Sequence, residues 1–200
     1  MNSDKDIVIT SAFRTPIGSF QGSLKDHKAT ELGTAVVKKC MEHSNLNGSE
    51  VDTVILGQVL QTGCGQNPAR QAAINSGIDK DKTATTINQV CGSGLAAVTL
   101  GFNSLKLNDT NIVIAGGQES MTNSPHYLNY RMEKNLSEEK LKDSMLIDGL
   151  IDAYDDYHMG VTAENVAEKY QITRNDQDNF ALNSQKKAIK AISENKFKEE

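Results

Sequence analysis

A run of 23 residues without a single charged side chain, from position 83 to 105, constrains this chain more than any other feature. It reads TATTINQVCGSGLAAVTLGFNSL, in a protein of which 24% is charged. Polar residues and three glycines interrupt the run, so it contains no continuous apolar stretch of about 18 to 20 residues such as a membrane helix needs. We therefore expect a strand, a glycine turn and a helix, all lying deep inside a folded domain.

Strand and helix patterns alternate on both sides of this run. Residues 7–12, 51–60 and 111–119 are rich in β-branched or apolar side chains and predict strands. Apolar residues at helical spacing predict a helix over 29–41, and Asn67 followed by Pro68 predicts the start of another. This alternation predicts an α/β fold of the βαβαβ kind, with a mixed, mainly parallel sheet between helices.

The character of the sequence changes after about Ser120. The remainder is more polar and acidic and contains no convincing long strand. Thr173 and Asp176 resemble a capping box at the start of a long helix. We expect a domain over 1–120 and a mostly helical excursion over 121–200.

Composition excludes several classes of function. The net charge is −5, and the only tight basic groups are Lys38/Lys39 and Lys186/Lys187, so a nucleic-acid partner is not expected. The start of the chain lacks the basic and apolar regions of a secretory signal, which favours a cytoplasmic protein. Three cysteines without CxxC spacing argue against a disulfide framework and a structural metal site, so we expect no metal.

Cys91 is the cysteine best suited to chemistry. It lies between the end of an apolar strand and the start of a helix, where helix N–H groups favour a thiolate. Gly92 and Gly94 leave room beside the sulfur for a substrate carbonyl. A buried cysteine that only packs is the alternative, and it suits Cys40 on the apolar stripe of the first helix. Cys64, in a loop, has no helix start directly behind it.

The segment INQVCGSGLAA (87–97) resembles the active-site signature of thiolases around their acyl-accepting cysteine. Four more segments are similar to thiolase landmarks in the same order: SAFRTPIGSFQGSL, GCGQNPARQAA, IAGGQESM and YHMGVTAENVA. Together they span the chain. Cys64 and Gln118 are the departures within these landmarks.

The resemblance implies a thiolase-like fold and an acetyl-CoA C-acetyltransferase. Cys91 would take an acyl group from acyl-CoA, and an acetyl-CoA enolate would then attack that thioester in a Claisen condensation. Alternatively, the enzyme would catalyse the reverse reaction, the thiolysis of a 3-ketoacyl-CoA. Acyl-CoA and CoA would be substrates, with no resident cofactor. The resemblance also implies fatty acid metabolism and a homo-oligomer, dimer or tetramer, in the complete enzyme. A membrane partner is not expected, because the uncharged run lacks a continuous apolar stretch.

Thiolases carry a GHPxG histidine, a water-holding Asn and a CxGxG cysteine in a C-terminal half, and neither motif occurs in these residues. We therefore expect a truncated chain, an incomplete excursion and no activity of the chain alone. A non-catalytic remnant or assembly fragment is the alternative, and a ketoacyl synthase relative is a more distant one. By the same resemblance, Leu150, His158 and Met159 would border the acyl end of the substrate pocket, although a histidine bonded to backbone at a helix start is the plainer reading of His158.

Overall fold

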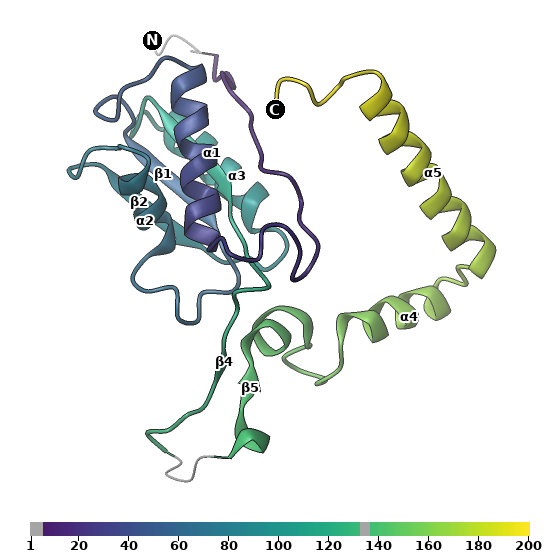
Figure 1. Ribbon diagram of the computed structural model, residues 1–200. Coiled ribbons are helices and arrows are strands. Elements are labelled where there is room, and N and C mark those ends of the chain that lie inside the picture. The colour runs from purple at the N-terminus through teal and green to yellow at the C-terminus, as the bar shows by residue number, and fades with distance from the viewer. Residues whose placement is uncertain (1–5, 133–136) are drawn as a thin grey trace. The chain divides into compact units, whose positions relative to one another are not determined.

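The computed structural model describes residues 6–132 and 137–200 (Figure 1). The chain forms two compact units, Met1–Gly149 and Leu150–Glu200. The boundary between them falls after Gly149, whereas the predicted division into 1–120 and 121–200 rests on a change of composition. That division stays a prediction.

A three-stranded parallel sheet organises the first unit. Its strands are β1 (Thr53–Gly57), β2 (Thr83–Ile87) and β3 (Val113–Gly117), in the spatial order β2-β1-β3. Both pairs are parallel, so the carboxyl ends of all three strands meet at one edge of the sheet. The predicted parallel arrangement is confirmed.

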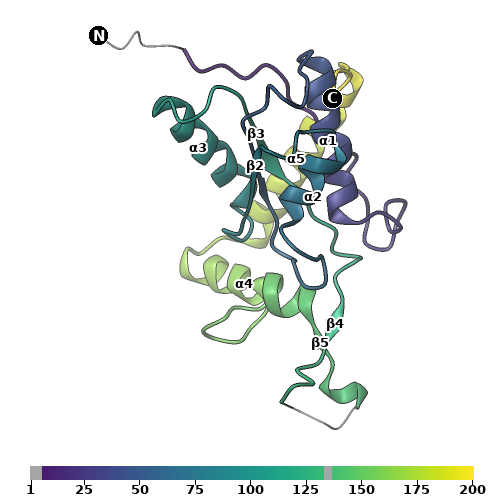
Figure 2. The same ribbon diagram turned by 90° about the vertical axis from the view of Figure 1, so that its left-hand side faces the viewer.

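Helices cover both faces of this sheet. Helices α1 (Ala29–His43) and α2 (Pro68–Asn75) contact each other and lie on one face, and α3 (Ser93–Lys106) packs on the other face against β1 and β3 (Figure 2). Asn67 caps α2 as expected, because its side-chain oxygen accepts the Arg70 N–H at 3.1 Å. The predicted sheet between helices is therefore confirmed.

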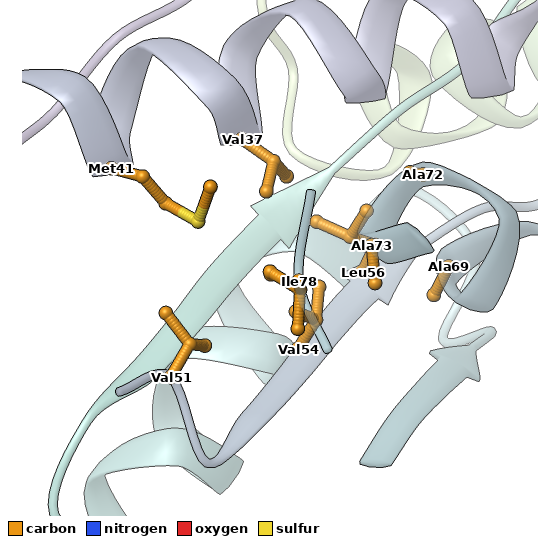
Figure 3. Packing of buried hydrophobic residues seen from close by; sticks show 9 residues of the cluster. All are labelled: Val37, Met41, Val51, Val54, Leu56, Ala69, Ala72, Ala73 and Ile78. Carbon is orange, nitrogen blue, oxygen red and sulfur yellow. The ribbon is translucent and has the colours of Figure 1, made fainter. Parts of the chain in front are cut away.

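The buried core lies between the sheet and the α1 and α2 layer. All five residues of β1 are buried. Figure 3 shows how apolar side chains of α1, α2 and β1 meet. The cluster consists of Val37, Met41, Val51, Val54, Leu56, Ala69, Ala72, Ala73 and Ile78. Small alanines of α2 let this helix lie close to the strands.

Shorter elements follow β3. Strands β4 (His126–Tyr127) and β5 (Lys142–Asp143) form a separate antiparallel pair. A 3₁₀ turn η1 (Glu138–Lys140) precedes β5, and a π-helical turn η2 (Leu146–Leu150) follows it. These elements contain no long strand, as the sequence predicted.

The second unit contains two helices, α4 (Met159–Lys169) and α5 (Arg174–Ser193). The predicted capping box is present, because the Asp176 N–H donates to Thr173 Oγ1 at 3.2 Å and the Thr173 N–H donates to Asp176 Oδ2 at 3.1 Å. Neither helix has a buried residue. Among the helices of residues 6–132 and 137–200, none is both long enough and apolar enough to span a bilayer.

Two expectations are wrong. Residues 7–12 form no strand, and Val8 and Ile9 are 70% and 81% exposed, so the β-branched side chains of this segment are not buried in a sheet. The uncharged run does not lie deep inside either. Strand β2 is at an edge of the sheet, and α3 buries only Ser93, Ala97 and Gly101.

Candidate active site

Cys91 lies at the carboxyl edge of the parallel sheet, where open α/β sheets place their ligand sites. Strand β2 ends at Ile87, a turn over 88–92 follows, and α3 begins at Ser93. Cys91 is the exposed cysteine of the three, whereas Cys40 and Cys64 are partly buried. The order of strand, turn, cysteine and helix is therefore as predicted.

The chain bends at a different residue of this turn than expected. Gly92 has an ordinary φ of −82°. Val90 instead adopts the left-handed region, with φ 49°. A β-branched residue avoids this region because its side chain collides with its own backbone. Sequence reasoning missed this residue because the adjacent glycines offered an easier turn.

The local geometry suits nucleophilic chemistry at the thiol. Cys91 stands two residues before a 14-residue helix, so the N-terminal N–H groups of α3 are close along the chain. Such groups can donate to a developing oxyanion. Gly94, in the first turn of α3, faces the end of β3, because a Cβ there would lie 3.9 Å from the carbonyl carbon of Gly116. The expected room for a substrate carbonyl beside Gly94 stays a prediction.

The ends of β1 and β3 carry a buried polar network on the same edge of the sheet. Gln118 Nε2 donates to Gln58 Oε1 at 2.8 Å, and Gln58 Nε2 donates to the Leu60 carbonyl at 2.8 Å and to Cys64 Sγ at 3.2 Å. These contacts hold the segment that follows β1. Sequence reasoning did not find them, although each glutamine directly follows a strand that ends in glycine.

Glu119 extends this network. Its carboxylate accepts the Val59 N–H at 2.8 Å and the Leu60 N–H at 3.3 Å. Burial raises the pKa of Glu119, while hydrogen bonds from these backbone N–H groups act in the opposite direction. The side chain therefore ties the end of β3 to the segment after β1 beside the site.

Cys64 borders a small cavity of about 230 Å³ that Lys28, Ser120 and Pro125 also line. Its sulfur accepts the Gln58 amide N–H described above and points toward backbone carbonyls of its own loop. Cys40 lies in α1. Neither cysteine combines exposure with a helix start, so Cys91 remains the candidate nucleophile.

The three residues expected to border the substrate all lie in the second unit, with Leu150 as its first residue and His158 and Met159 at the start of α4. His158 caps α4, and its Nδ1 accepts the Gly160 N–H at 3.0 Å. An isolated bridge between Ile151 and His158 brings Leu150 and Met159 to the same end of a short loop. The plainer reading of His158 is therefore the one observed, and a pocket shared with Cys91 stays a prediction.

Within residues 6–132 and 137–200, no three His, Cys, Asp or Glu side chains gather in a way that could hold an ion.

Known proteins match this chain along almost all of its length. The family model described as "Thiolase, N-terminal domain" matches residues 7–200. An acetyl-CoA acetyltransferase of Pseudomonas aeruginosa is 51% identical over 98% of this chain and 50% of its own length. A probable acetyl-CoA acetyltransferase of Escherichia coli is 52% identical, again over 98% of this chain and 50% of its own length.

The fold is also similar to a solved structure. The crystal structure of the Acat5 thiolase from Ascaris suum in complex with coenzyme A superposes with a TM-score of 0.91 at 38% identity. The match covers 98% of this chain and 51% of that one. The chain thus spans about half the length of these relatives.

Proposed function

Because this chain belongs to the thiolase family and corresponds to its N-terminal domain, we propose that it supplies the acyl-accepting cysteine of an acetyl-CoA C-acetyltransferase. The observation that carries the proposal is Cys91, an exposed thiol between the carboxyl end of β2 and the start of α3. That position offers a nucleophile that a thioester can reach.

The proposed reaction has two steps. In the first, the Cys91 thiolate attacks the thioester carbonyl of acetyl-CoA, forms a carbon–sulfur bond and releases the CoA thiolate. In the second, a base removes a proton from the methyl carbon of another acetyl-CoA, and the resulting carbanion attacks the acyl-cysteine. Cys91 leaves as a thiolate, and the product is acetoacetyl-CoA. Thiolysis is the same sequence in reverse.

Coenzyme A and acyl-CoA are the proposed partners. Support comes from the relatives named as acetyl-CoA acetyltransferases and from the related thiolase that was crystallised with coenzyme A. We propose no resident cofactor. Leu150, His158 and Met159 are proposed to shape the acyl end of the pocket, and a homo-oligomer is proposed for the complete enzyme. A role in fatty acid metabolism also belongs to the proposal.

We further propose that the 200 residues alone do not turn over. The GHPxG histidine and CxGxG cysteine of thiolases have no counterpart among them. A general base and a set of oxyanion donors each contribute about 10²-fold or more to such reactions. Losing both leaves the exposed thiol without the groups that would activate it and stabilise the charged intermediates.

The test joins this chain to the C-terminal half of the Pseudomonas aeruginosa relative and follows acetoacetyl-CoA thiolysis. The fused protein is expected to turn over, and the same fusion with Cys91→Ala is expected to be inactive. The 200-residue chain alone is the second control and should be inactive. A fusion that folds but stays inactive favours a non-catalytic fragment, and turnover by the Cys91→Ala fusion contradicts the proposed nucleophile.

A further inference from the structure

The backbone at Val90, directly before the candidate nucleophile, is in a conformation that its side chain opposes. Its φ is 49°. The other non-glycine residues with positive φ among those described are all Asn, Asp or Gln, residue types that tolerate this region better. Val90 is also half exposed, at 50%, so close packing of its own side chain does not impose the conformation. Something else in the structure must hold it.

The hydroxyl of Ser93 bonds to the peptide groups on both sides of this bend. Ser93 Oγ accepts the Gln89 N–H at 2.8 Å and donates to the Val90 carbonyl at 2.6 Å. The side chain of Asn88 adds a third bond, because its Oδ1 accepts the Val90 N–H at 2.9 Å. The peptide groups before and after Val90 are thus both tied to side chains.

Ser93 is itself held against the sheet. Ser93 is 4% exposed. It lies so near Gly57, the last residue of β1, that a Cβ added to Gly57 would be 2.5 Å from the Cβ of Ser93. This close approach fixes the first residue of α3 on the end of the central strand. The hydroxyl therefore connects the strained bend to the buried central strand of the first unit.

We propose that Ser93 is a positioning residue, whose hydroxyl clamps the left-handed conformation of Val90 and thereby fixes the backbone of Cys91 for attack on a thioester. The proposal rests on the function proposed for Cys91. Backbone strain of this kind persists where the surrounding structure over-determines it, and it concentrates at active sites. Asn88 assists from the solvent side of the turn.

The clamp can be tested on the 200-residue chain through alkylation of its cysteines by iodoacetamide, followed by mass spectrometry. Cys40 and Cys64 serve as internal references. Ser93→Ala is expected to slow Cys91 alkylation about fivefold relative to these two thiols, because Val90 relaxes and the thiol leaves its fixed position. Ser104→Ala, which removes a hydroxyl of the same helix bonded to Thr110 at 2.9 Å, is the matched control and should have no effect.

A second substitution separates clamping from a general structural role. Val90→Gly adopts positive φ without strain and should react like the wild type. In this background Ser93→Ala should lose most of its effect, because the conformation no longer needs the hydroxyl. A merely structural contribution of Ser93 would be the same in both backgrounds. Equal losses, or no loss with Ser93→Ala in a folded protein, would overturn the proposal.

Asn88→Ala keeps the test decisive if Ser93→Ala does not fold, as circular dichroism will show. The Asn88 side chain is exposed, and its removal should slow Cys91 in the same direction by a smaller factor that Val90→Gly also restores. No change with Asn88→Ala would then overturn the clamp. Activity of the fused protein is a separate readout, so an inactive fusion with slowed alkylation refutes the proposed function but not the clamp.

Discussion

At the scale of single residues, two carboxylates hold opposite ends of the sheet, and their pKa values are shifted in opposite directions. Glu119 ties the carboxyl end of β3 to the segment after β1. Asp52 joins the other ends of the same strands, because its Oδ2 accepts the Asn111 N–H at 2.7 Å and the Ile112 N–H at 3.1 Å. Burial is the main cause of the pKa shift of Glu119 and raises that pKa. Hydrogen bonds from backbone N–H groups are the main cause at the more exposed Asp52 and lower its pKa.

The raised pKa of Glu119 predicts a loss of stability with rising pH. The folded state binds a proton more readily than the unfolded chain, so this contribution is present below the ordinary range of a glutamate and is lost as pH rises through the folded pKa. Glu119→Gln should remove that part of the slope. Urea unfolding across a pH series measures it, with Glu42→Gln on exposed α1 surface as the control. Identical slopes for wild type and Glu119→Gln would contradict the assignment.

Asp52 predicts the reverse dependence. The Asn111 and Ile112 N–H groups lower the pKa of Asp52, so its contribution is present above the ordinary range of an aspartate and is lost as pH falls through the folded pKa. Asp52→Asn should therefore lower the free energy of unfolding at neutral pH by about 1 kcal/mol, a modest value because the group faces solvent. At acidic pH the difference from wild type should vanish. Asp109→Asn, on the nearby exposed loop, should show neither effect.

At the scale of elements, close contact of α3 with the sheet depends on small residues. Helix α3 buries Ser93, Ala97 and Gly101, while Leu95 on the same helix is 74% exposed. A Cβ on Gly101 would lie 3.0 Å from Val113 Cγ1 of β3. The helix therefore approaches the strands along a narrow line of small residues that runs from its first residue, Ser93, to Gly101.

This packing predicts opposite effects for two neighbouring glycines. A Cβ on Gly57 would lie 2.5 Å from Ser93 Cβ and 2.9 Å from the Gly94 nitrogen, so Gly57→Ala should destabilise the fold by roughly 1–3 kcal/mol. Gly94→Ala meets nothing nearer than 3.9 Å and should stabilise the helix by roughly 0.5–1 kcal/mol. Thermal unfolding of both variants checks this. A stable Gly57→Ala protein would show that α3 can move away from β1.

Helix positions followed from the sequence because they depend on local pattern. The stripe from Ala29 to Met41, the Asn67 cap and the Thr173 capping box all act within a few residues. Which residues are buried was harder to predict from the sequence. Absence of charge in 83–105 indicated an interior segment, but whether a strand lies at an edge depends on partners far along the chain.

The candidate site was predictable only in part for the same reason. Cys91 and the start of its helix follow from neighbouring residues. The contact of Ser93 with Gly57 and the pairing of Gln58 with Gln118 join residues that the fold brings together from separate strands. No periodicity links such positions, and the left-handed Val90 contradicts the intrinsic preference of its residue type.

At the scale of the whole molecule, the first unit carries the candidate nucleophile, and Leu150, His158 and Met159 belong to the second. The chain spans about half the length of the thiolases that it matches. The chain belongs to a family of acyltransferases. In the mechanism that we propose, turnover also needs the GHPxG histidine and the CxGxG cysteine, which these 200 residues do not contain.

An acyl-enzyme trapping experiment tests the central claim that Cys91 accepts the acyl group. The fused protein is mixed with acetyl-CoA, quenched in acid and digested, and the peptides are analysed by mass spectrometry. One acetyl group on the peptide that contains Cys91, absent from the Cys91→Ala fusion, is the predicted result. An active fusion that carries its acetyl group on Cys64, Cys40 or no cysteine of this chain would contradict the account.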